Sequence, residues 1–262
     1  MTPLAVAASL AGTSALAVSL RFHWWRPRRR GVPVLMYHQI APHRPGSALN
    51  RWRLRAEDFE RQLDHLVRRG LVGVPLRDLL DAPPRPGDRR VVLTFDDGYD
   101  GVRSAALPLL RDRGFSATVF VVSGRLGGRN VWDGETPGDV LLCADGVREL
   151  AAAGFEIGSH GATHRALPEL PDAELAPETR GSRERLEEIA GVPVVSFCYP
   201  YGACDERAVA AVRDAGYRAA TVIGGGLVPD LEDPFRLRRV AVRGTRRLLD
   251  FRLALTRGRS TF

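Results

Sequence analysis

The feature that most constrains the fold is a regular alternation, beginning after Gly31, of short apolar runs with segments of helical period. This alternation is typical of a parallel β/α architecture, in which amphipathic helices cover strands that are buried on both faces. We therefore expect an α/β fold whose strands form a barrel. The expected strands are 32–37, 91–95, 117–122, 155–158 and 194–199, with shorter ones near 219 and 237. The expected helices are 56–69, 104–113, 146–153, 172–190 and 206–215.

Length and composition fit one large domain. The chain has 262 residues, of which 44% are hydrophobic and 26% charged, so it can bury a single core. Its net charge is +7, and it contains no lysine, so the positive charge comes from arginines crowded into 21–30 and 236–259. An anionic partner, such as a phospholipid surface or an acidic wall polymer, is one interpretation, and a solvated basic face is the simpler one. We find no nucleic-acid-binding motif, and we expect a monomer without a nucleic-acid partner.

The three cysteines give an odd count and no C-x-x-C spacing, so they do not report the redox compartment. They are Cys143, Cys198 and Cys204. Cys198 and Cys204 could pair if the geometry allowed, and three unpaired residues are the default expectation.

Residues 1–30 form an N-terminal appendage. Residues 2–20 carry no charge and have roughly the length needed to cross a bilayer, and arginines and tryptophans follow them. We expect a membrane segment or an uncleaved signal anchor. A cleaved signal peptide is the rival, because Ala15-Leu16-Ala17 resembles a processing site. The positive-inside rule conflicts with an external substrate, but we expect a membrane-anchored or secreted protein of the cell envelope, with its catalytic domain over 31–262.

Two adjacent carboxylates follow the expected strand 91–95. Asp96 and Asp97 repel each other as anions unless a positive charge lies beside them, so their place at a strand exit indicates a cation site. The alternative is a solvated Asp-Asp-Gly turn that closes the strand. Adjacent residues at a strand end diverge in direction, so one can bind a metal while the other takes a proton from water.

A histidine pair follows the expected strand 155–158. His160 and His164 are four residues apart, so both imidazoles point the same way if the segment turns helically. Two imidazoles and a carboxylate make a three-point site for one divalent ion, with zinc favoured and iron, cobalt or nickel open. Residue 161 is Gly where a helical zinc protease carries its Glu base, which argues against that class. A non-haem iron oxygenase uses the same ligand types, but the paired aspartates argue against it.

Asp96, Asp97, His160 and Tyr201 each lie just after a predicted strand, and His38 does the same after 32–37. In a β/α barrel such residues converge on the C-terminal face, where catalysis takes place. The segment 197–202 (FCYPYG) closes another strand with a constrained turn. There, Pro200 and Tyr201 could present a backbone N–H to an oxyanion and an aromatic ring to a sugar. Taken alone, a structural turn is the simpler interpretation of this segment.

Together these motifs resemble the polysaccharide deacetylase family, the fourth carbohydrate esterase family, also called the NodB homology domain. Residues 94–98 (TFDDG), 160–164 (HGATH) and 197–202 are similar to its first, second and third motifs. The resemblance extends from about 31 to about 242, with a motif core at about 89–242. It implies a distorted (β/α) barrel of seven or eight strands and the removal of N-acetyl groups from a GlcNAc-containing polysaccharide.

The resemblance also implies a role for each site residue. Asp96 corresponds to the general base, and Asp97, His160 and His164 correspond to the ligands of one divalent metal ion. Tyr201 corresponds to the aromatic residue that lines the groove and whose backbone amide stabilises the oxyanion.

The sequence departs from the family pattern in two places. Many members carry an Arg in the third motif that holds the catalytic Asp, and Cys198 stands in that place. Arg239 is our candidate to orient Asp96 instead. The late Leu-x-His motif that supplies the general acid is absent, because no His follows His164.

The opening residues 32–38 (VPVLMYH) suggest another source of the acid. They resemble the branch that contains the poly-N-acetylglucosamine deacetylases, in which the acid comes from the first strand. His38 is then the candidate acid, and a buried structural histidine is the alternative.

The leading expectation is metal-dependent hydrolysis of an acetamide on a GlcNAc polymer. An O-acetyl esterase is the near alternative, because ester cleavage uses the same water and oxyanion and demands less of the acid. A hydrolytically idle, membrane-tethered glycan-binding domain is the alternative from another class, suggested by the two departures.

Overall fold

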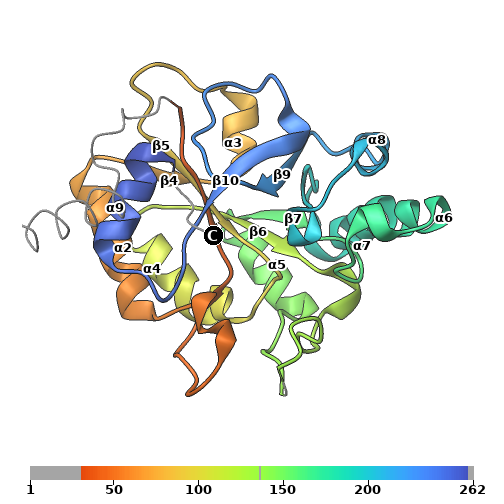
Figure 1. Cartoon of the computed structure of the whole chain (residues 1–262), viewed down its shortest axis with the longest axis horizontal. Coiled ribbons are helices and arrows are strands. Elements are labelled where there is room, and N and C mark those ends of the chain that lie inside the picture. Colours follow the sequence, from red (N-terminus) through yellow and green to blue (C-terminus); the bar gives the residue numbers. More distant parts are fainter. Residues whose placement is uncertain (1–30, 136, 259–262) are drawn as a thin grey trace, which may run out of the picture.

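Parallel strands form the centre of the molecule, and all but one of them close into a barrel (Figure 1). The computed structural model describes residues 31–135 and 137–258. The strands of this sheet are β1 (Val34–Tyr37), β4 (Val72–Val74), β5 (Arg90–Phe95), β6 (Thr118–Val121), β7 (Glu156–Ser159), β8 (Ser196–Cys198), β9 (Ala219–Ile223) and β10 (Leu237–Ala241). The ring runs β1, β10, β9, β8, β7, β6, β5, and β1 closes it by pairing with both β10 and β5. Since β4 pairs with β5 only, a ring of seven strands carries an eighth, which confirms the expected barrel.

The strand registers align the carboxyl ends of the strands at one end of the ring. Tyr37, the last residue of β1, lies opposite Phe95, the last of β5, and Ser159 of β7 lies opposite Phe197 of β8. Because every pairing in the ring is parallel, the residues that follow these strands all emerge at the same mouth.

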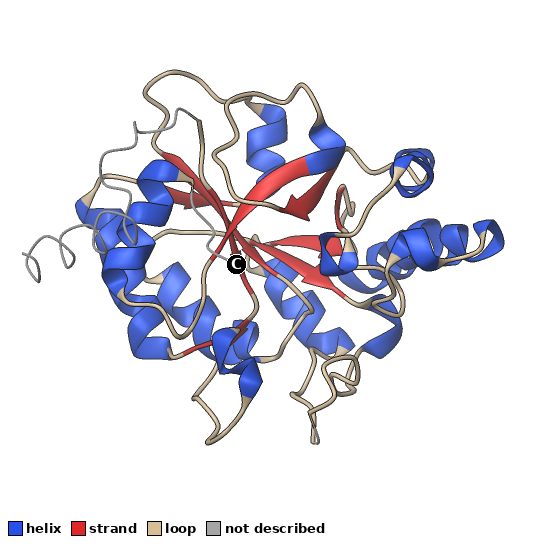
Figure 2. Cartoon of the chain, viewed as in Figure 1, coloured by secondary structure: helices blue, strands red, loops and turns tan. Residues whose placement is uncertain are grey.

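Helices surround the strands on the outside (Figure 2). They are α2 (Ala56–Arg68), α3 (Leu76–Asp81), α4 (Leu107–Arg111), α5 (Ala144–Ala152), α6 (Asp172–Ala176), α7 (Ser182–Ala190), α8 (Glu206–Asp214) and α9 (Leu248–Arg257). Helix α2 shows why they form: Phe59, Leu63 and Leu66 fall on one face and are buried, and the chain leaves the helix through Gly70 at φ 64°. Of these helices, α3 and α9 were not expected from the sequence.

The expected helix 172–190 contains an irregular turn. A π-helical turn over Pro177–Gly181 separates α6 from α7. Proline cannot donate an N–H to the helical ladder, and π turns of this kind are often found at functional sites. The turn buries Glu178, which contacts the candidate site.

A small parallel pair, β2 (Gln39–Ile40) with β3 (Arg53–Leu54), holds the 41–52 loop at the barrel mouth. Arg53 anchors it from a buried position, with Nε and Nη2 donating to Asp139 Oδ2 at 3.0 and 2.6 Å. As a result Trp52, just before β3, lies beside His38, just before β2.

The opposite end of the barrel contains a buried carboxyl group. Glu156, the first residue of β7, accepts hydrogen bonds from the hydroxyls of Thr118 and Ser196 and from the backbone N–H of Arg77, at 2.6 to 2.8 Å. Burial raises the pKa of Glu156, and these donors oppose the rise.

The predicted membrane or signal segment, residues 1–30, lies outside the described residues. Within the described part of the chain, no helix combines the length and apolarity that a membrane crossing requires. All three cysteines are free thiols, as the default expectation had it.

Candidate active site

Three predicted metal ligands meet at the barrel mouth. Asp97 Oδ1 lies 3.3 Å from Nε2 of His160 and 3.1 Å from Nε2 of His164, and all three side chains are buried. Their ligand atoms lie within 4.8 Å of one another, and a carboxylate with two imidazoles is a donor set that suits a divalent ion. Burial raises the pKa of Asp97, but the hydrogen bonds from the two histidines outweigh it and hold the pKa well below its usual value. Asp97 is therefore an anion, as a metal ligand must be.

The two histidines converge through a tight turn and not through a helix. Strand β7 ends at Ser159, and the segment up to His164 is irregular, with His164 itself at φ 65°. The buried carboxylate of Glu178 holds the turn: it accepts the backbone N–H groups of Ala162 at 2.7 Å and Thr163 at 3.0 Å, and the Thr163 hydroxyl. The two imidazoles therefore converge as their spacing suggested, but the helical turn expected between them is absent from residues 160–164.

His160 is oriented for coordination. Its Nδ1 lies 2.7 Å from the carbonyl oxygen of Cys198, which fixes that nitrogen as the donor and turns Nε2 toward Asp97. Metal-binding histidines commonly use their second nitrogen in this way. His164 is held differently, between the ring of Trp132, stacked at 4.3 Å, and the ring of Tyr201 at 4.8 Å.

Asp96 has a separate set of partners. Arg239 Nη1 donates to its Oδ1 at 2.6 Å and Nη2 to its Oδ2 at 2.8 Å, and Nη1 also donates to Thr94 at 3.0 Å. Cys198 Sγ lies 3.6 Å from Asp96 and 3.1 Å from Arg239. Burial raises the pKa of Asp96, but the Arg239 guanidinium outweighs burial and lowers it. The two adjacent carboxylates therefore have different environments: Asp97 faces the histidines and Asp96 faces a guanidinium.

A second triplet, Asp96, His160 and Cys198, also has ligand atoms within 4.8 Å of one another. Because both oxygens of Asp96 accept hydrogen bonds from Arg239, the triplet built on Asp97 is the better metal site.

Residues 84–220 match the family model described as polysaccharide deacetylase, a stretch longer than half of the chain. This chain belongs to the polysaccharide deacetylase family. The deacetylase is 25% identical over 214 residues to YxkH of Bacillus subtilis, whose name assigns it provisionally to the polysaccharide deacetylases; the match covers 80% of this chain and 71% of YxkH. Members of the family are hydrolases, so this deacetylase is one too.

Solved structures share the fold of the deacetylase. The crystal structure of BC0361, a polysaccharide deacetylase from Bacillus cereus, has a TM-score of 0.73 and 25% identity, over 87% of this chain and 69% of that one. IcaB from Ammonifex degensii has a TM-score of 0.70 and 24% identity, over 83% of this chain and 94% of that one.

The structure places His38 of the deacetylase at the same mouth. Its ring stacks on Trp52 with centroids 4.4 Å apart, and burial is the main cause that lowers its pKa. The negative charges of Asp97 and Asp96 oppose that fall in the pKa.

Tyr201 lies on the surface of the deacetylase site, and the residue is 56% exposed, an unusual position for a large aromatic residue. It follows Pro200, which is buried and opens a short helical turn. Tyr201, Asp97 and His164 are the non-glycine residues with positive φ in the described part of the chain. Each such conformation costs about 1–3 kcal/mol, and strained residues of this kind cluster at functional sites.

Three residues of the deacetylase site were missed by the sequence analysis. Trp52 and Trp132 stack on His38 and His164, and Glu178 anchors the turn between the histidines. The sequence held a weak signal for the two tryptophans. Both lie in polar segments outside the expected strands and helices, where a large apolar ring is not needed for the core.

Proposed function

We propose that this deacetylase hydrolyses the acetamide of a GlcNAc-containing polysaccharide with the help of one divalent metal ion, zinc being the best fit. Asp97, His160 and His164 would hold the ion. When bound, such an ion lowers the pKa of its water and polarises the acetyl carbonyl. The observation that carries the proposal is that the two adjacent aspartates have different partners. Asp97 contacts the two histidines and can bind the ion with them, whereas Asp96 contacts Arg239 and can accept a proton.

The remaining roles follow from the positions of the other side chains. Asp96 takes a proton from the attacking water, and Arg239 keeps it ionised and oriented. The backbone N–H of Tyr201, held by its left-handed turn, stabilises the charge that develops on the carbonyl oxygen. His38 gives a proton to the departing amine as the carbon–nitrogen bond breaks, so the products are acetate and a glucosamine unit.

The test is acetate release from chitooligosaccharides, peptidoglycan and poly-GlcNAc. Metal-stripped protein should release no acetate, and protein reconstituted with zinc should release it from at least one of these N-acetylated glycans. If the protein binds the glycans but releases no acetate with zinc, iron, cobalt or nickel, the proposal is refuted in favour of an idle binding domain. Arg239 argues against that alternative, because it provides the guanidinium that the third motif lacks.

O-deacetylation is the second candidate, and the environment of His38 favours it. Because burial lowers the pKa of His38, less of its protonated form is present at neutral pH, and ester cleavage demands less of the acid than amide cleavage. Acetate release from matched N-acetylated and O-acetylated oligosaccharides separates the two activities. Attachment to a membrane and a cell-envelope location remain predictions.

A further inference from the structure

Buried charges join two loops at the barrel mouth. One is the 41–52 loop, and the other lies between β6 and α5. Arg53, which follows the first loop, donates from Nε and Nη2 to Oδ2 of Asp139 in the second, at 3.0 and 2.6 Å. Arg53 is 1% exposed and Asp139 is 4% exposed. Figure 1 shows the two loops side by side at the lower edge of the molecule, the first in orange and the second in green. We call the Arg53–Asp139 ion pair the loop clamp.

Further charges surround the loop clamp. Arg53 also donates to Glu135, and Arg44 donates to Glu135 at 3.1 Å and to Asp139, so two guanidinium groups face two carboxylates. Burial removes water from charged groups, so an apolar contact could stabilise the loops as well or better. The hydrogen bonds of a guanidinium are directional, and a charged pair therefore fixes one relative position of the loops.

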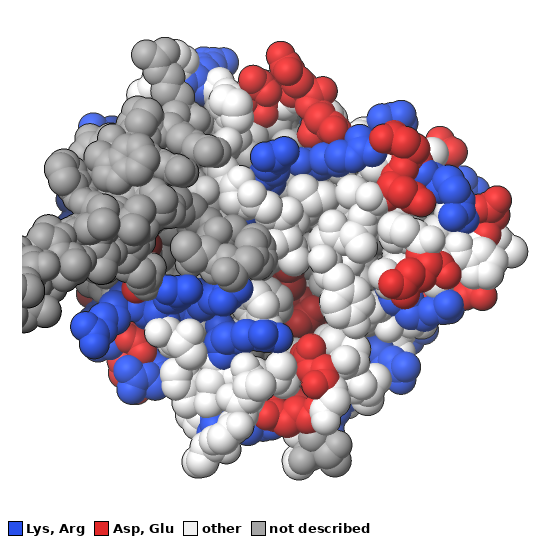
Figure 3. All heavy atoms as spheres, viewed as in Figure 1, with Lys and Arg blue, Asp and Glu red and all other residues white. Residues whose placement is uncertain are grey.

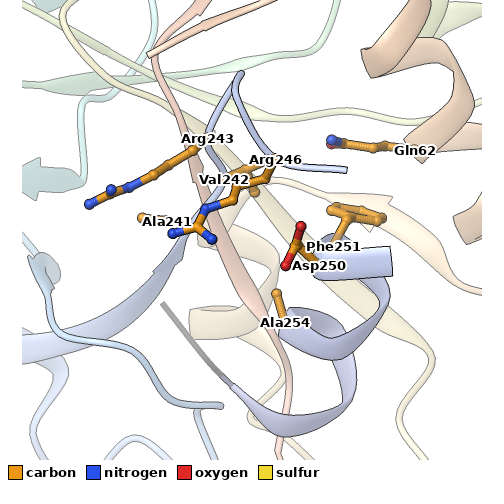
Figure 4. Close-up of a pocket in the computed structure, with 8 residues that line it drawn as sticks. All are labelled: Gln62, Ala241, Val242, Arg243, Arg246, Asp250, Phe251 and Ala254. Carbon is orange, nitrogen blue, oxygen red and sulfur yellow. The ribbon is translucent and has the colours of Figure 1, made fainter. Parts of the chain in front are cut away.

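The first loop carries Trp52, which precedes Arg53 in the chain and is half-buried. One contact of its ring is the ring of His38, with centroids 4.4 Å apart, and another is the guanidinium carbon of Arg243 at 5.4 Å. Figure 4 shows the Arg243 side chain extending away from Phe251. The cavity in that view measures only about 30 Å³, enough for water and not for a sugar. Trp52 is thus held at the mouth, against the candidate acid.

The second loop carries Trp132, and Asn130 connects it to the loop clamp. The N–H of Asn130 donates to the carbonyl oxygen of Asp139 at 2.9 Å, and its Oδ1 accepts the N–H of Trp132 at 3.0 Å. The two sides of this loop touch directly, because a Cβ on Gly138 would lie 1.8 Å from the carbonyl oxygen of Asn130. Trp132 in turn stacks on His164 at 4.3 Å.

The loop clamp therefore lies between two tryptophans that stack on two different histidines of the site. Figure 3 shows acidic side chains at the floor of a central recess, so the site stays open to a ligand while its loops are tied together. A catalytic group that moves by about 1 Å can lose about 10²-fold in rate, so the positions of these rings matter for the reaction.

We propose that Arg53 and Asp139 are positioning residues, whose ion pair holds Trp52 against His38 and Trp132 against His164. The inference rests on the proposed function, in which His38 supplies the proton to the leaving amine and His164 holds the metal ion. Neither member of the loop clamp touches the reacting atoms; each acts through a tryptophan.

The main test is Asp139→Asn, which keeps the shape of the side chain and removes its charge. Initial rates of acetate release are measured for the zinc-loaded full chain on matched N-acetylated and O-acetylated oligosaccharides. We expect kcat to fall about tenfold or more on the N-acetylated form and clearly less on the O-acetylated form, because ester cleavage demands less of the acid. In the His38→Gln background, Asp139→Asn should leave the ratio of the two activities unchanged.

A second variant and a control accompany Asp139→Asn. Glu135→Gln removes the more exposed carboxylate of the same network and should change the ratio in the same direction, by a smaller factor. The control is Asp88→Asn, which breaks a pair of equal length, 2.6 Å, to Arg90 at the first residue of β5, at the other end of the barrel. The control should keep the ratio of the unchanged protein.

A measurement without turnover follows the two rings directly. The full chain is labelled with fluorotryptophan, and the fluorine NMR resonances of Trp52 and Trp132 are assigned by Trp→Phe substitution in the metal-free protein. Both resonances should shift in Asp139→Asn and stay in place in Asp88→Asn.

The outcomes separate the two proposals. Equal losses on the N-acetylated and O-acetylated forms in both network variants, or tryptophan resonances that do not move, overturn the positioning role while the deacetylase activity stands. If the unchanged zinc-loaded protein releases no acetate from any N-acetylated glycan, the proposed function falls. The resonances then still decide whether the loop clamp holds the two tryptophans.

Discussion

Arg239 donates to both carboxylate oxygens of Asp96, at 2.6 and 2.8 Å, across the strand that closes the barrel. Arg239 lies on β10, Asp96 follows β5, and β1 stands between them. Both side chains are buried, so a geometry this close stabilises the ionised form of Asp96 and fixes its direction. The neighbouring Asp97 contacts the two histidines instead, so the two carboxylates differ in their partners.

Asp96→Asn should lower acetate release by about 10²–10⁴-fold, the usual contribution of a general base, and leave bound zinc unchanged. The amide keeps the shape of the side chain but cannot accept the proton. The rate of acetate release and the zinc content, the latter by mass spectrometry, are measured for the variant and the unchanged protein. Asp97→Asn is the control, since it should lose the metal and the activity together. Full activity of Asp96→Asn would remove Asp96 from the mechanism.

Arg239→Met should shift the acidic limb of the pH–rate profile to higher pH. Arg239 lowers the pKa of Asp96, so without it burial dominates and the pKa rises. The base works only as a carboxylate, hence more activity is lost on the acid side. The free energy of unfolding should also fall by about 3–5 kcal/mol, as when one partner of a buried pair is removed. Arg239→Lys keeps the charge and should restore part of both properties; an unmoved acidic limb in Arg239→Met contradicts the orienting role.

Zinc should raise the melting temperature of the metal-stripped protein. A ligand that binds only the folded state at 100 times its Kd adds about 2.7 kcal/mol to the free energy of unfolding. His164→Gln removes one proposed ligand and should diminish the shift, whereas His43→Gln, a histidine in the loop beyond β2, should show the full shift. Equal shifts in both variants would place the ion elsewhere.

His38→Gln should impair amide cleavage more than ester cleavage. An amine is a poor leaving group until it is protonated, so loss of the acid should cost about 10²–10⁴-fold on N-acetylated oligosaccharides. The loss on O-acetylated oligosaccharides should be clearly smaller. Initial rates of acetate release on the matched pair give the two ratios, and identical losses would assign His38 a structural role.

Glu156→Gln should change how stability depends on pH without touching the catalytic end. Burial raises the pKa of Glu156, so the folded state favours the protonated carboxyl group. The resulting stability is fully present at pH values below the pKa that Glu156 has in the unfolded chain. It is lost as the pH rises through the higher pKa that Glu156 has in the folded protein. The loss amounts to about 1.4 kcal/mol for each pKa unit of the rise. The Gln variant cannot titrate, so its free energy of unfolding in urea should fall less between pH 5 and pH 8. If the pH dependence of the free energy of unfolding were the same in both proteins, the pKa of Glu156 would not be raised by folding.

The sequence allowed the barrel and the polar residues at its mouth to be predicted, because both depend on short-range pattern. Alternating apolar runs define the strands, and Asp96, Asp97 and His160 lie at strand ends, whose direction follows from the fold. The position of Arg239 was anticipated only from the missing Arg of the third motif. The structure brings it to Asp96 because β10 and β5 flank β1.

The rest of the site depends on contacts between distant segments. No local pattern shows that Glu178, on a π turn, reaches back to the backbone between His160 and His164 and replaces the helical turn that their spacing suggested. Trp52 reaches His38 through the short β2–β3 pair, whose two-residue strands are too brief to be seen in a hydrophobic pattern.

The closure of the ring by β1 also has a consequence for biosynthesis. β1 is translated long before β10, yet it must pair with both β10 and β5. Contacts of such long sequence separation form late and slowly. Arg239 is thus synthesised after most of the chain, so the ion pair that orients Asp96, the proposed base, can form only after β10 has left the ribosome.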